Sequence, residues 1–199
     1  RLWLMQLIHP ELGRIMGVSL HGAPAVLIGF NDHFAWSHTV SAAFRFTFYE
    51  LNMVGPTSYQ FDAGTRELEA TNITIDVLED NGQIAQQSRT LYKSHYGPMV
   101  TIVADALDWG ATKAYTLRDA NLENTAVIEQ FFQWNKAQSI DEFKAAQRNV
   151  LGVPWVNTVA VGNTGDAYYT DITVVPNVPN SKVATCAAEP ANSVVQNLA

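Results

Sequence analysis

Five histidines and several serines offer the side chains of a metal site, or of a nucleophile with its base. His33 and His38 lie on a predicted turn and a predicted strand, so their side chains point to opposite faces and cannot share a metal ion. Ser19 and Ser37 can each be paired with a histidine on paper, but neither lies in the Gly-x-Ser-x-Gly sequence of a nucleophile elbow. A conventional Ser-His-Asp hydrolase is therefore disfavoured.

The carboxylates give no catalytic pair. Asp32, Asp108, Asp119 and Asp171 fall on different predicted elements, where solvated or turn-capping roles account for them. Residues 118–124 form a polar run beside an apolar helix, and we interpret it as a hydrogen-bonded ion-pair loop that fixes a strand to that helix.

Cys186 is the only cysteine, so the chain can form neither an internal disulfide nor a cysteine zinc site. Two interpretations stay open for it. The side chain is a small buried hydrophobe, or it is one half of a disulfide whose partner lies beyond Ala199.

Residues 29–40 have the composition of active-site scaffolding without a nucleophile. Apolar and aromatic residues at 25–30 and 34–40 predict two strands, and the turn residues at 31–33 join them into a hairpin. The second strand runs into residues 41–43, whose small side chains leave the backbone open to a ligand. We therefore expect a backbone N–H to be presented at this point.

Trp155 and Asn157 lie where a predicted helix gives way to a strand. Trp155 is equally well explained as a core residue or as the wall of a pocket, with Asn157 as the nearby polar group. Both alternatives stay open.

The surrounding pattern predicts an α+β protein. Alternation of Phe44, Phe46 and Phe48 with polar neighbours predicts a half-buried strand, and the same alternation at residues 73–77 predicts another. The turn residues at 80–82 predict a hairpin. Helical spacing begins near residue 126. Ser139 and Glu142 form a capping-box pattern that opens a helix over 140–149, with Phe143 on its inner face.

A strand pair is predicted at 155–161 and 166–170, with a turn between the two strands. Beyond it, three prolines among Asn, Ser and Ala predict that residues 176–199 are extended or partly disordered.

The composition excludes several classes of partner. A net charge of −7, an isoelectric point near 5.1 and only 12 Lys and Arg argue against a nucleic acid or an anionic membrane. No run of 18 apolar residues occurs, so no membrane-spanning helix is expected. Charged residues make up 16% of the chain, below the roughly 25% usual for soluble domains, which suggests that other protein covers part of the surface. Residues 1–5 lack the features of a signal peptide and are expected to continue from an upstream segment.

Several motifs occur in a fixed order along the chain: residues 19–24 leading into 29–40, then 96–98, 117–124, and 154–158 followed by 165–169. Together they resemble the large subunit of the penicillin amidase family, N-terminal-nucleophile hydrolases whose precursors cleave themselves into a small and a large subunit. Within the family, residues 38–40, 118–124 and 154–158 are most similar to acyl-homoserine lactone acylases and related lipopeptide acylases.

The resemblance implies a four-layer αββα sandwich, to which this chain contributes sheet strands, two helices and a β-rich insertion. Residues 1–175 then form part of the large-subunit core, and 176–199 form the tail. The nucleophile implied is a serine that precedes Arg1 and uses its own α-amino group as general base. The oxyanion hole implied combines a backbone N–H, which matches Val40, with an asparagine side chain beyond Ala199. The chain alone is therefore expected to be inactive.

By the same resemblance the acyl group enters a deep apolar pocket with Asn157 beside it. The candidate wall residues are Ala23, Leu27, Ile28, Thr39, Phe131, Trp155 and Val156. Many family members bind calcium through carboxylates shortly after the oxyanion strand, but residues 41–47 contain none, so we expect no metal. No cofactor is implied.

The reaction implied is hydrolysis of the linear amide of an N-acyl-homoserine lactone or a similar N-acyl compound. Two alternatives stay open, namely a penicillin or cephalosporin acylase fragment and a non-catalytic, β-rich binding module. The partners implied are the N-acyl substrate, the small subunit and the remainder of the large subunit, with no nucleic acid and no membrane span. Family members are exported, so a periplasmic location is expected, and Cys186 is compatible with a disulfide there.

Overall fold

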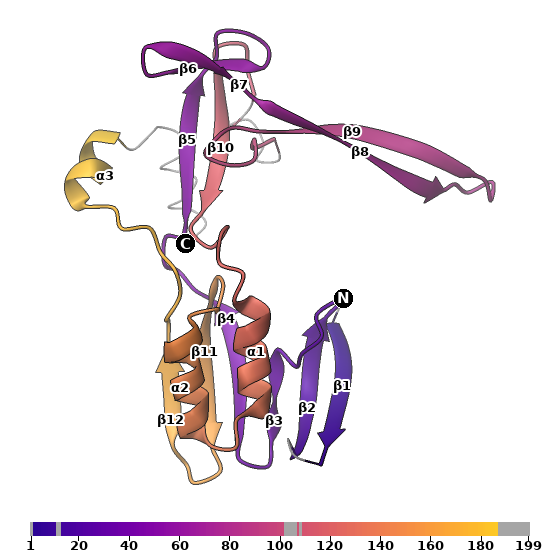
Figure 1. Ribbon diagram of the computed structural model, residues 1–199, viewed down its shortest axis with the longest axis vertical. Coiled ribbons are helices and arrows are strands. Elements are labelled where there is room, and N and C mark those ends of the chain that lie inside the picture. Colours follow the sequence, from indigo (N-terminus) through magenta and orange to yellow (C-terminus); the bar gives the residue numbers. More distant parts are fainter. Residues whose placement is uncertain (1, 11–12, 102–106, 108, 187–199) are drawn as a thin grey trace. The chain divides into compact units, whose positions relative to one another are not determined.

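The computed structural model describes residues 2–10, 13–101, 107 and 109–186, and the chain divides into two compact units (Figure 1). The first unit consists of Arg1–Arg45 and Ala120–Pro176, and the second of Phe46–Asp119 and Asn177–Ala199. Each unit has its own sheets and its own core. The described elements are mostly strands with few helices.

One antiparallel sheet of six strands forms the first unit, in the order β1-β2-β3-β4-β11-β12 (Figure 1). The strands are β1 Leu2–His9, β2 Gly13–Leu20, β3 Ile28–Asn31, β4 Phe34–Val40, β11 Val156–Gly162 and β12 Ala167–Thr170. The β3–β4 turn forms because the side-chain oxygen of Asn31 accepts the backbone N–H groups of His33 and Phe34, each at 2.9 Å. On its other side β4 pairs with β11, so a strand from late in the chain lies beside the early hairpin.

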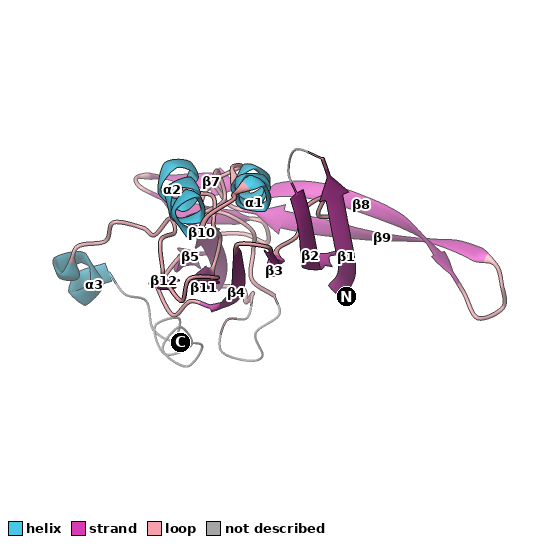
Figure 2. Cartoon of the chain, turned by 90° about the horizontal axis from the view of Figure 1, so that it is seen from below, coloured by secondary structure: helices cyan, strands magenta, loops and turns pink. Residues whose placement is uncertain are grey.

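Two helices cover one face of this sheet, α1 Val127–Lys136 and α2 Ile140–Val150 (Figure 2). Helix α2 begins where the sequence predicts, because the Ser139 hydroxyl accepts the backbone N–H of Glu142 at 3.1 Å. It ends at Leu151, which takes a left-handed conformation with φ 55°. None of the helices described is long and apolar enough to cross a membrane.

The core of the first unit lies between the helices and the sheet. Trp134 of α1 stacks on Phe143 of α2 with ring centroids 4.5 Å apart, and both side chains are fully buried. Phe143 also contacts Phe34 and Trp36 of β4, at centroid distances of 5.1 and 5.9 Å. Aromatic side chains bury large apolar areas, so this cluster dominates the attachment of the helices to the sheet. The prediction that Phe143 faces inward is confirmed.

Close packing of β2 on β3 depends on a pair of glycines. Gly17 is directly opposite Gly29, and the side chain of Val26 lies over both. A Cβ atom on Gly17 would lie 2.6 Å from the Gly29 Cα and 2.1 Å from the Ile28 carbonyl oxygen. Any side chain at this position would therefore push the two strands apart.

The opposite face of the sheet is covered by none of the described helices. Cross-strand partners share a face, and the register places Leu4, Ile8, Phe30 and Tyr169 together on this one. Their exposed fractions are 70, 69, 53 and 65%. A row of large exposed apolar side chains across one sheet is the feature expected of a surface that packs against something else.

The second unit is built from antiparallel strand pairs. These are β5 Phe46–Asn52 with β10 Lys113–Asp119, β6 Ser58–Phe61 with β7 Gly64–Glu67, and β8 Glu69–Leu78 with β9 Ile84–Lys93. Its core contains Leu51, Met53, Tyr59, Leu68 and Ala114. The β8–β9 hairpin turns at Gly82, with φ 80°, which confirms the predicted turn at 80–82.

One predicted strand boundary is wrong. Residues 25–30 were expected to form a strand, but β3 begins at Ile28. The reason is that the Asn135 side chain forms hydrogen bonds with both the backbone N–H and the carbonyl of Val26, each at 2.8 Å. Within the tail predicted to be extended or partly disordered, the structure has a short helix, α3 Asn180–Cys186. The rest of that tail, 187–199, lies outside the described residues, and the division at 175 stays a prediction.

Candidate functional site

Strand β4 has one edge that is paired along its length and one that is not. It pairs with β11 from Phe34 to Val40, whereas its pairing with β3 consists of Ala35 and Trp36 alone. In the described parts of the chain, the β3-side edge of β4 is therefore without a partner strand at Val40. The predicted strand 34–40 is confirmed, and its last residue lies at an open edge.

The hydrogen-bond alternation of the sheet fixes the direction of the Val40 backbone. The N–H of Ser41 donates to the carbonyl of Trp155 at 2.9 Å, so Ser41 faces the chain that leads into β11. Successive residues of an antiparallel strand face opposite neighbours. The N–H of Val40 therefore points to the open edge, which makes it available to an acceptor from outside the sheet.

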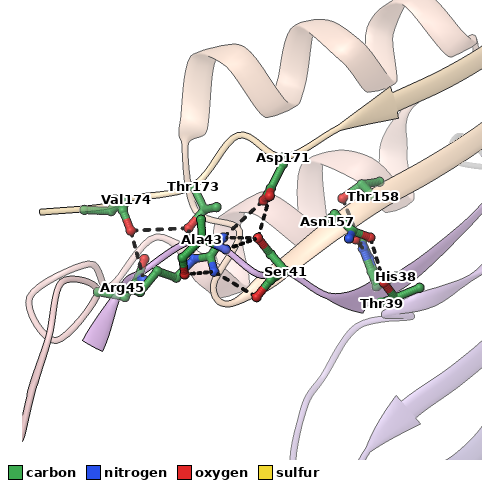
Figure 3. A network of polar contacts seen from close by, with 11 residues as sticks. His38, Thr39, Ser41, Ala43, Arg45, Asn157, Thr158, Asp171, Thr173 and Val174 are labelled. Atoms are coloured by element: carbon green, nitrogen blue, oxygen red, sulfur yellow. Dashed lines mark hydrogen bonds and ion pairs between the residues drawn. The ribbon is translucent and has the colours of Figure 1, made fainter. Parts of the chain in front are cut away.

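A buried guanidinium lies just past the C-terminal end of β4 (Figure 3). The side chain of Arg45 is 2% exposed. Its Nη2 donates to the hydroxyl of Ser41 at 2.6 Å and to Asp171 Oδ1 at 3.1 Å. Its Nη1 donates to the carbonyls of Ser41 and Ala43 at 3.4 and 3.0 Å, and its Nε donates to the hydroxyl of Thr173 at 3.0 Å. Every guanidinium nitrogen thus has an oxygen partner.

Ser41 and Asp171 close this network. The Ser41 hydroxyl donates to Asp171 Oδ2 at 2.5 Å while it accepts from Arg45. Asp171 supplies the carboxylate that a buried positive charge requires, and it follows directly after β12. The residues 41–45, the Arg45 side chain and Asp171 are called the clamp from here on.

The clamp overturns one sequence interpretation. Phe44 and Phe46 were expected to face inward, with Arg45 outward, but Phe44 and Phe46 are 60 and 42% exposed and Arg45 is buried. Arg45 can be buried because the oxygen acceptors around its guanidinium replace the water that would solvate it. The alternation of apolar and polar residues along a strand does not predict such burial. Strand β5 begins only at Phe46.

Arg45, Asp171 and Thr173 were not predicted as a group. The sequence signal available was weak: a charged residue within an aromatic run, and an aspartate just after a strand. The polar run 118–124 also supports this region, because the N–H of Ala120 donates to the Arg45 carbonyl at 3.1 Å and Asn121 donates to the Val174 carbonyl at 3.4 Å.

His38 lies beneath the sheet, on the helix side. Its ring stacks on Trp134 at 5.5 Å and meets the edge of Phe131 at 5.7 Å. Nε2 lies 3.1 Å from the Leu27 carbonyl, and Nδ1 lies 3.1 Å from the Thr158 hydroxyl. Burial lowers the pKa of His38 below its usual 6.5, although hydrogen bonds to backbone carbonyls raise it. Nδ1 also lies 3.2 Å from the Asn157 carbonyl, and a neutral ring donates to only one of the two backbone carbonyls.

The predicted pocket residues fall on both sides of the sheet. Ile28, Thr39 and Asn157 share the helix-free face, where the Thr39 hydroxyl donates to the Asn157 side-chain oxygen at 3.0 Å. Phe131 is a buried core residue of α1, and Leu27 and Val156 pack against that same core. The described residues thus do not bring these side chains into one cavity, and the pocket stays a prediction.

Two further predicted residues lie in turns. Ala23 is half-buried, and its carbonyl accepts the Ser19 hydroxyl at 3.1 Å, which gives that serine a structural role. Trp155 is 48% exposed and has a positive φ of 45°, an uncommon conformation for a bulky residue. A hollow between α1 and α2 contains none of the predicted residues.

A metal site requires that side chains able to bind the ion lie close together. No group of three or more His, Cys, Asp and Glu suited to a metal ion occurs among the residues described by the structure. After β4, where carboxylates were sought, the local charge is the guanidinium of Arg45.

The chain is similar to known proteins over nearly its whole length. A sequence profile of the family described as penicillin amidase matches residues 1–196. The acyl-homoserine lactone acylase PvdQ of Pseudomonas fluorescens strain Pf-5 is 41% identical over 188 residues, 94% of this chain and 24% of the relative. The aculeacin-A acylase of Actinoplanes utahensis is 34% identical over 192 residues, 96% of this chain and 24% of the relative. The chain thus spans about a quarter of the length of these relatives.

A solved structure shares the fold. The thermostable penicillin G acylase of Alcaligenes faecalis superposes with a TM-score of 0.70 at 20% sequence identity, over 90% of this chain and 31% of that one. At this identity the similarity concerns the fold alone.

Proposed function

The chain belongs to the penicillin amidase family, and from that premise we propose that the complete gene product hydrolyses the linear amide bond of an N-acyl-homoserine lactone or a similar N-acyl compound. Two relatives carry the names of acylases, and the one named for acyl-homoserine lactones is 41% identical to this chain. That level of identity favours an N-acyl substrate of the same chemical class.

One observation carries the proposal, the outward backbone N–H at the end of β4. An acyl-transfer enzyme needs hydrogen-bond donors where negative charge develops on the carbonyl oxygen. The N–H of Val40 points to an open edge and belongs to a strand held on its other side by β11. We assign Val40 as a backbone donor of the oxyanion hole. One such donor contributes about 3 kcal/mol to transition-state stabilisation.

The proposed reaction proceeds by covalent catalysis. A serine hydroxyl, deprotonated by its own α-amino group, attacks the amide carbonyl and forms a tetrahedral intermediate whose oxygen accepts from Val40. The C–N bond then breaks, the amine leaves with the proton, and water releases the carboxylic acid from the acyl-enzyme. We propose that these 199 residues alone do not turn over substrate, because the chain spans about a quarter of the length of the related acylases.

The helix-free sheet face supports the proposed αββα architecture. Leu4, Phe30 and Tyr169 form an exposed apolar surface there, as a further sheet would require. Ile28, Thr39 and Asn157 lie on this face near the end of β4 and are the predicted wall residues best placed to contact an acyl chain. The small subunit and the rest of the large subunit are the proposed partners.

Substrate class is tested with the complete gene product. Hydrolysis of a fatty-acyl homoserine lactone is compared with that of benzylpenicillin, an aryl-acyl amide. A higher kcat/KM for the fatty-acyl compound supports the proposal. A preference for benzylpenicillin supports a penicillin acylase, and no hydrolysis of either favours the non-catalytic module.

We also propose a periplasmic location, in which Cys186 pairs with a cysteine elsewhere in the complete gene product. The intact mass measured after thiol alkylation, with and without prior reduction, tests the disulfide. Alkylation of Cys186 without reduction would contradict it.

A further inference from the structure

We propose that Arg45 is a positioning residue for the reaction: its clamped guanidinium fixes the chain after β4 and thereby the direction of the Val40 N–H. The inference rests on the proposed function and adds a residue to it. Arg45 lies in the sequence just beyond Val40, and its side chain turns back toward β4 (Figure 3).

The guanidinium of Arg45 fixes the conformation of the turn at residues 41–45 through hydrogen bonds. It donates hydrogen bonds to two carbonyls and one hydroxyl of residues 41–43 in the same turn. The Ser41 hydroxyl also accepts the N–H of Ala43 at 3.2 Å, so the turn is bonded to itself as well as to Arg45. Without the guanidinium these carbonyls would lose their donor inside a buried space, and the turn would rearrange to reach other donors.

Asp171 and Thr173 tie the turn to the rest of the first unit. They follow β12, which is joined to β4 through β11. Arg45 therefore connects the end of β4 to a segment more than 120 residues away in sequence, with contacts to both. A planar guanidinium can hold partners in several directions at once, which an ammonium on a flexible stem cannot do in the same geometry.

Val40 lies between two anchored neighbours. The Thr39 hydroxyl donates to the Asn157 side chain at 3.0 Å, and the Ser41 N–H donates to the Trp155 carbonyl at 2.9 Å. The Ser41 side chain is the part that Arg45 holds. Loss of the Arg45 contacts leaves Ser41 held on this side by its backbone bond to Trp155 alone, which lets the Val40 N–H turn away from the substrate oxygen.

A misaligned oxyanion donor affects the transition state more than the ground state. The substrate carbonyl needs little stabilisation, whereas the tetrahedral oxyanion depends on donors at about 2.7–3.1 Å. Arg45 variants should therefore lower kcat and leave KM nearly unchanged. A general loss of folding would instead change the amount of active enzyme and its unfolding temperature.

The test uses the complete gene product with Arg45→Met, Arg45→Lys and the control Arg14→Met. Arg14 also pairs with an aspartate, Asp32, but its side chain is 66% exposed. Active sites are titrated, and kcat, KM and inhibition by an alkylboronic acid and by the free fatty acid are measured. The boronic acid forms a tetrahedral adduct, and the fatty acid does not.

We expect Arg45→Met to lower kcat about tenfold to a hundredfold, to weaken boronic acid binding in parallel, and to leave fatty acid binding within about twofold. Arg45→Lys should recover part of kcat, and Arg14→Met should match the wild type. If Arg45→Met yields no folded protein, Ser41→Ala removes the hydroxyl between Arg45 and Asp171 and should show the same selective loss.

Three outcomes overturn the inference. An unchanged kcat in both Arg45→Met and Ser41→Ala removes the positioning role while the proposed function stands. An equal loss of boronic acid and fatty acid binding shows a structural role alone. A wild-type protein that hydrolyses no N-acyl amide overturns the proposed function, and the positioning role with it.

Discussion

The backbone N–H of Ser41 donates to the carbonyl of Trp155 at 2.9 Å, and this bond turns the N–H of the preceding residue, Val40, toward the opposite edge of β4. Trp155 makes the bond from a left-handed backbone conformation, with φ 45°. A residue with a Cβ atom is strained there by about 1–2 kcal/mol. The position at which β11 begins is therefore held by its surroundings against local preference.

Substitution of Trp155 separates this strain from side-chain packing. Both Trp155→Ala and Trp155→Gly lose the indole, but only glycine adopts positive φ without strain. We expect Trp155→Gly to be about 1 kcal/mol more stable than Trp155→Ala in chemical denaturation of the complete gene product. The reverse order would show that Trp155 does not keep this conformation in solution.

The aromatic cluster is expected to carry much of the stability of the first unit. Trp134→Ala removes a fully buried ring that stacks on Phe143 and should cost about 3–5 kcal/mol in the free energy of unfolding. Trp3→Ala is the matched control, because Trp3 is 57% exposed and should cost less than about 1 kcal/mol. Similar losses at the two positions would contradict the assigned core.

The cap of α2 is a local test of the same unit. Ser139→Ala leaves the Glu142 N–H without its side-chain acceptor and should lower the free energy of unfolding by about 1 kcal/mol. Ser139→Asn supplies another acceptor and should retain most of the stability. Equal losses for the two variants would show that the hydroxyl does not cap the helix.

His38 should make stability depend on pH below neutrality. Its folded-state pKa is lowered by burial, whereas the unfolded chain titrates near 6.5. Between these two pKa values the unfolded state binds more protons, so stability falls as the pH decreases below about 6.5 and is unaffected by His38 above it. Unfolding measured from pH 7 to 5 should show a smaller loss in His38→Gln than in the wild type.

Local features of this fold are predictable because neighbouring residues determine them. The Ser139 cap, the turn at 80–82 and the strand 34–40 each depend on a few adjacent side chains, and the structure confirms all three. The start of β3 was not predictable, because Asn135 competes for the Val26 backbone from 109 residues away.

The candidate site shows the same division. Val40 and the small residues after it can be recognised in the sequence as an exposed backbone at the end of a strand. The clamp cannot, because Arg45 and Asp171 are 126 residues apart and neither has a local signature. The αββα layers also stay a proposal, since the described residues show one face of the six-stranded sheet covered and the other exposed.

The products formed from an N-acyl-homoserine lactone test the central claim most directly. The complete gene product is incubated with a fatty-acyl homoserine lactone, and the products are identified by mass spectrometry. Amide hydrolysis predicts equal amounts of free fatty acid and homoserine lactone. An N-acyl-homoserine, formed by opening of the lactone ring with the amide intact, or the absence of any product, would contradict the account.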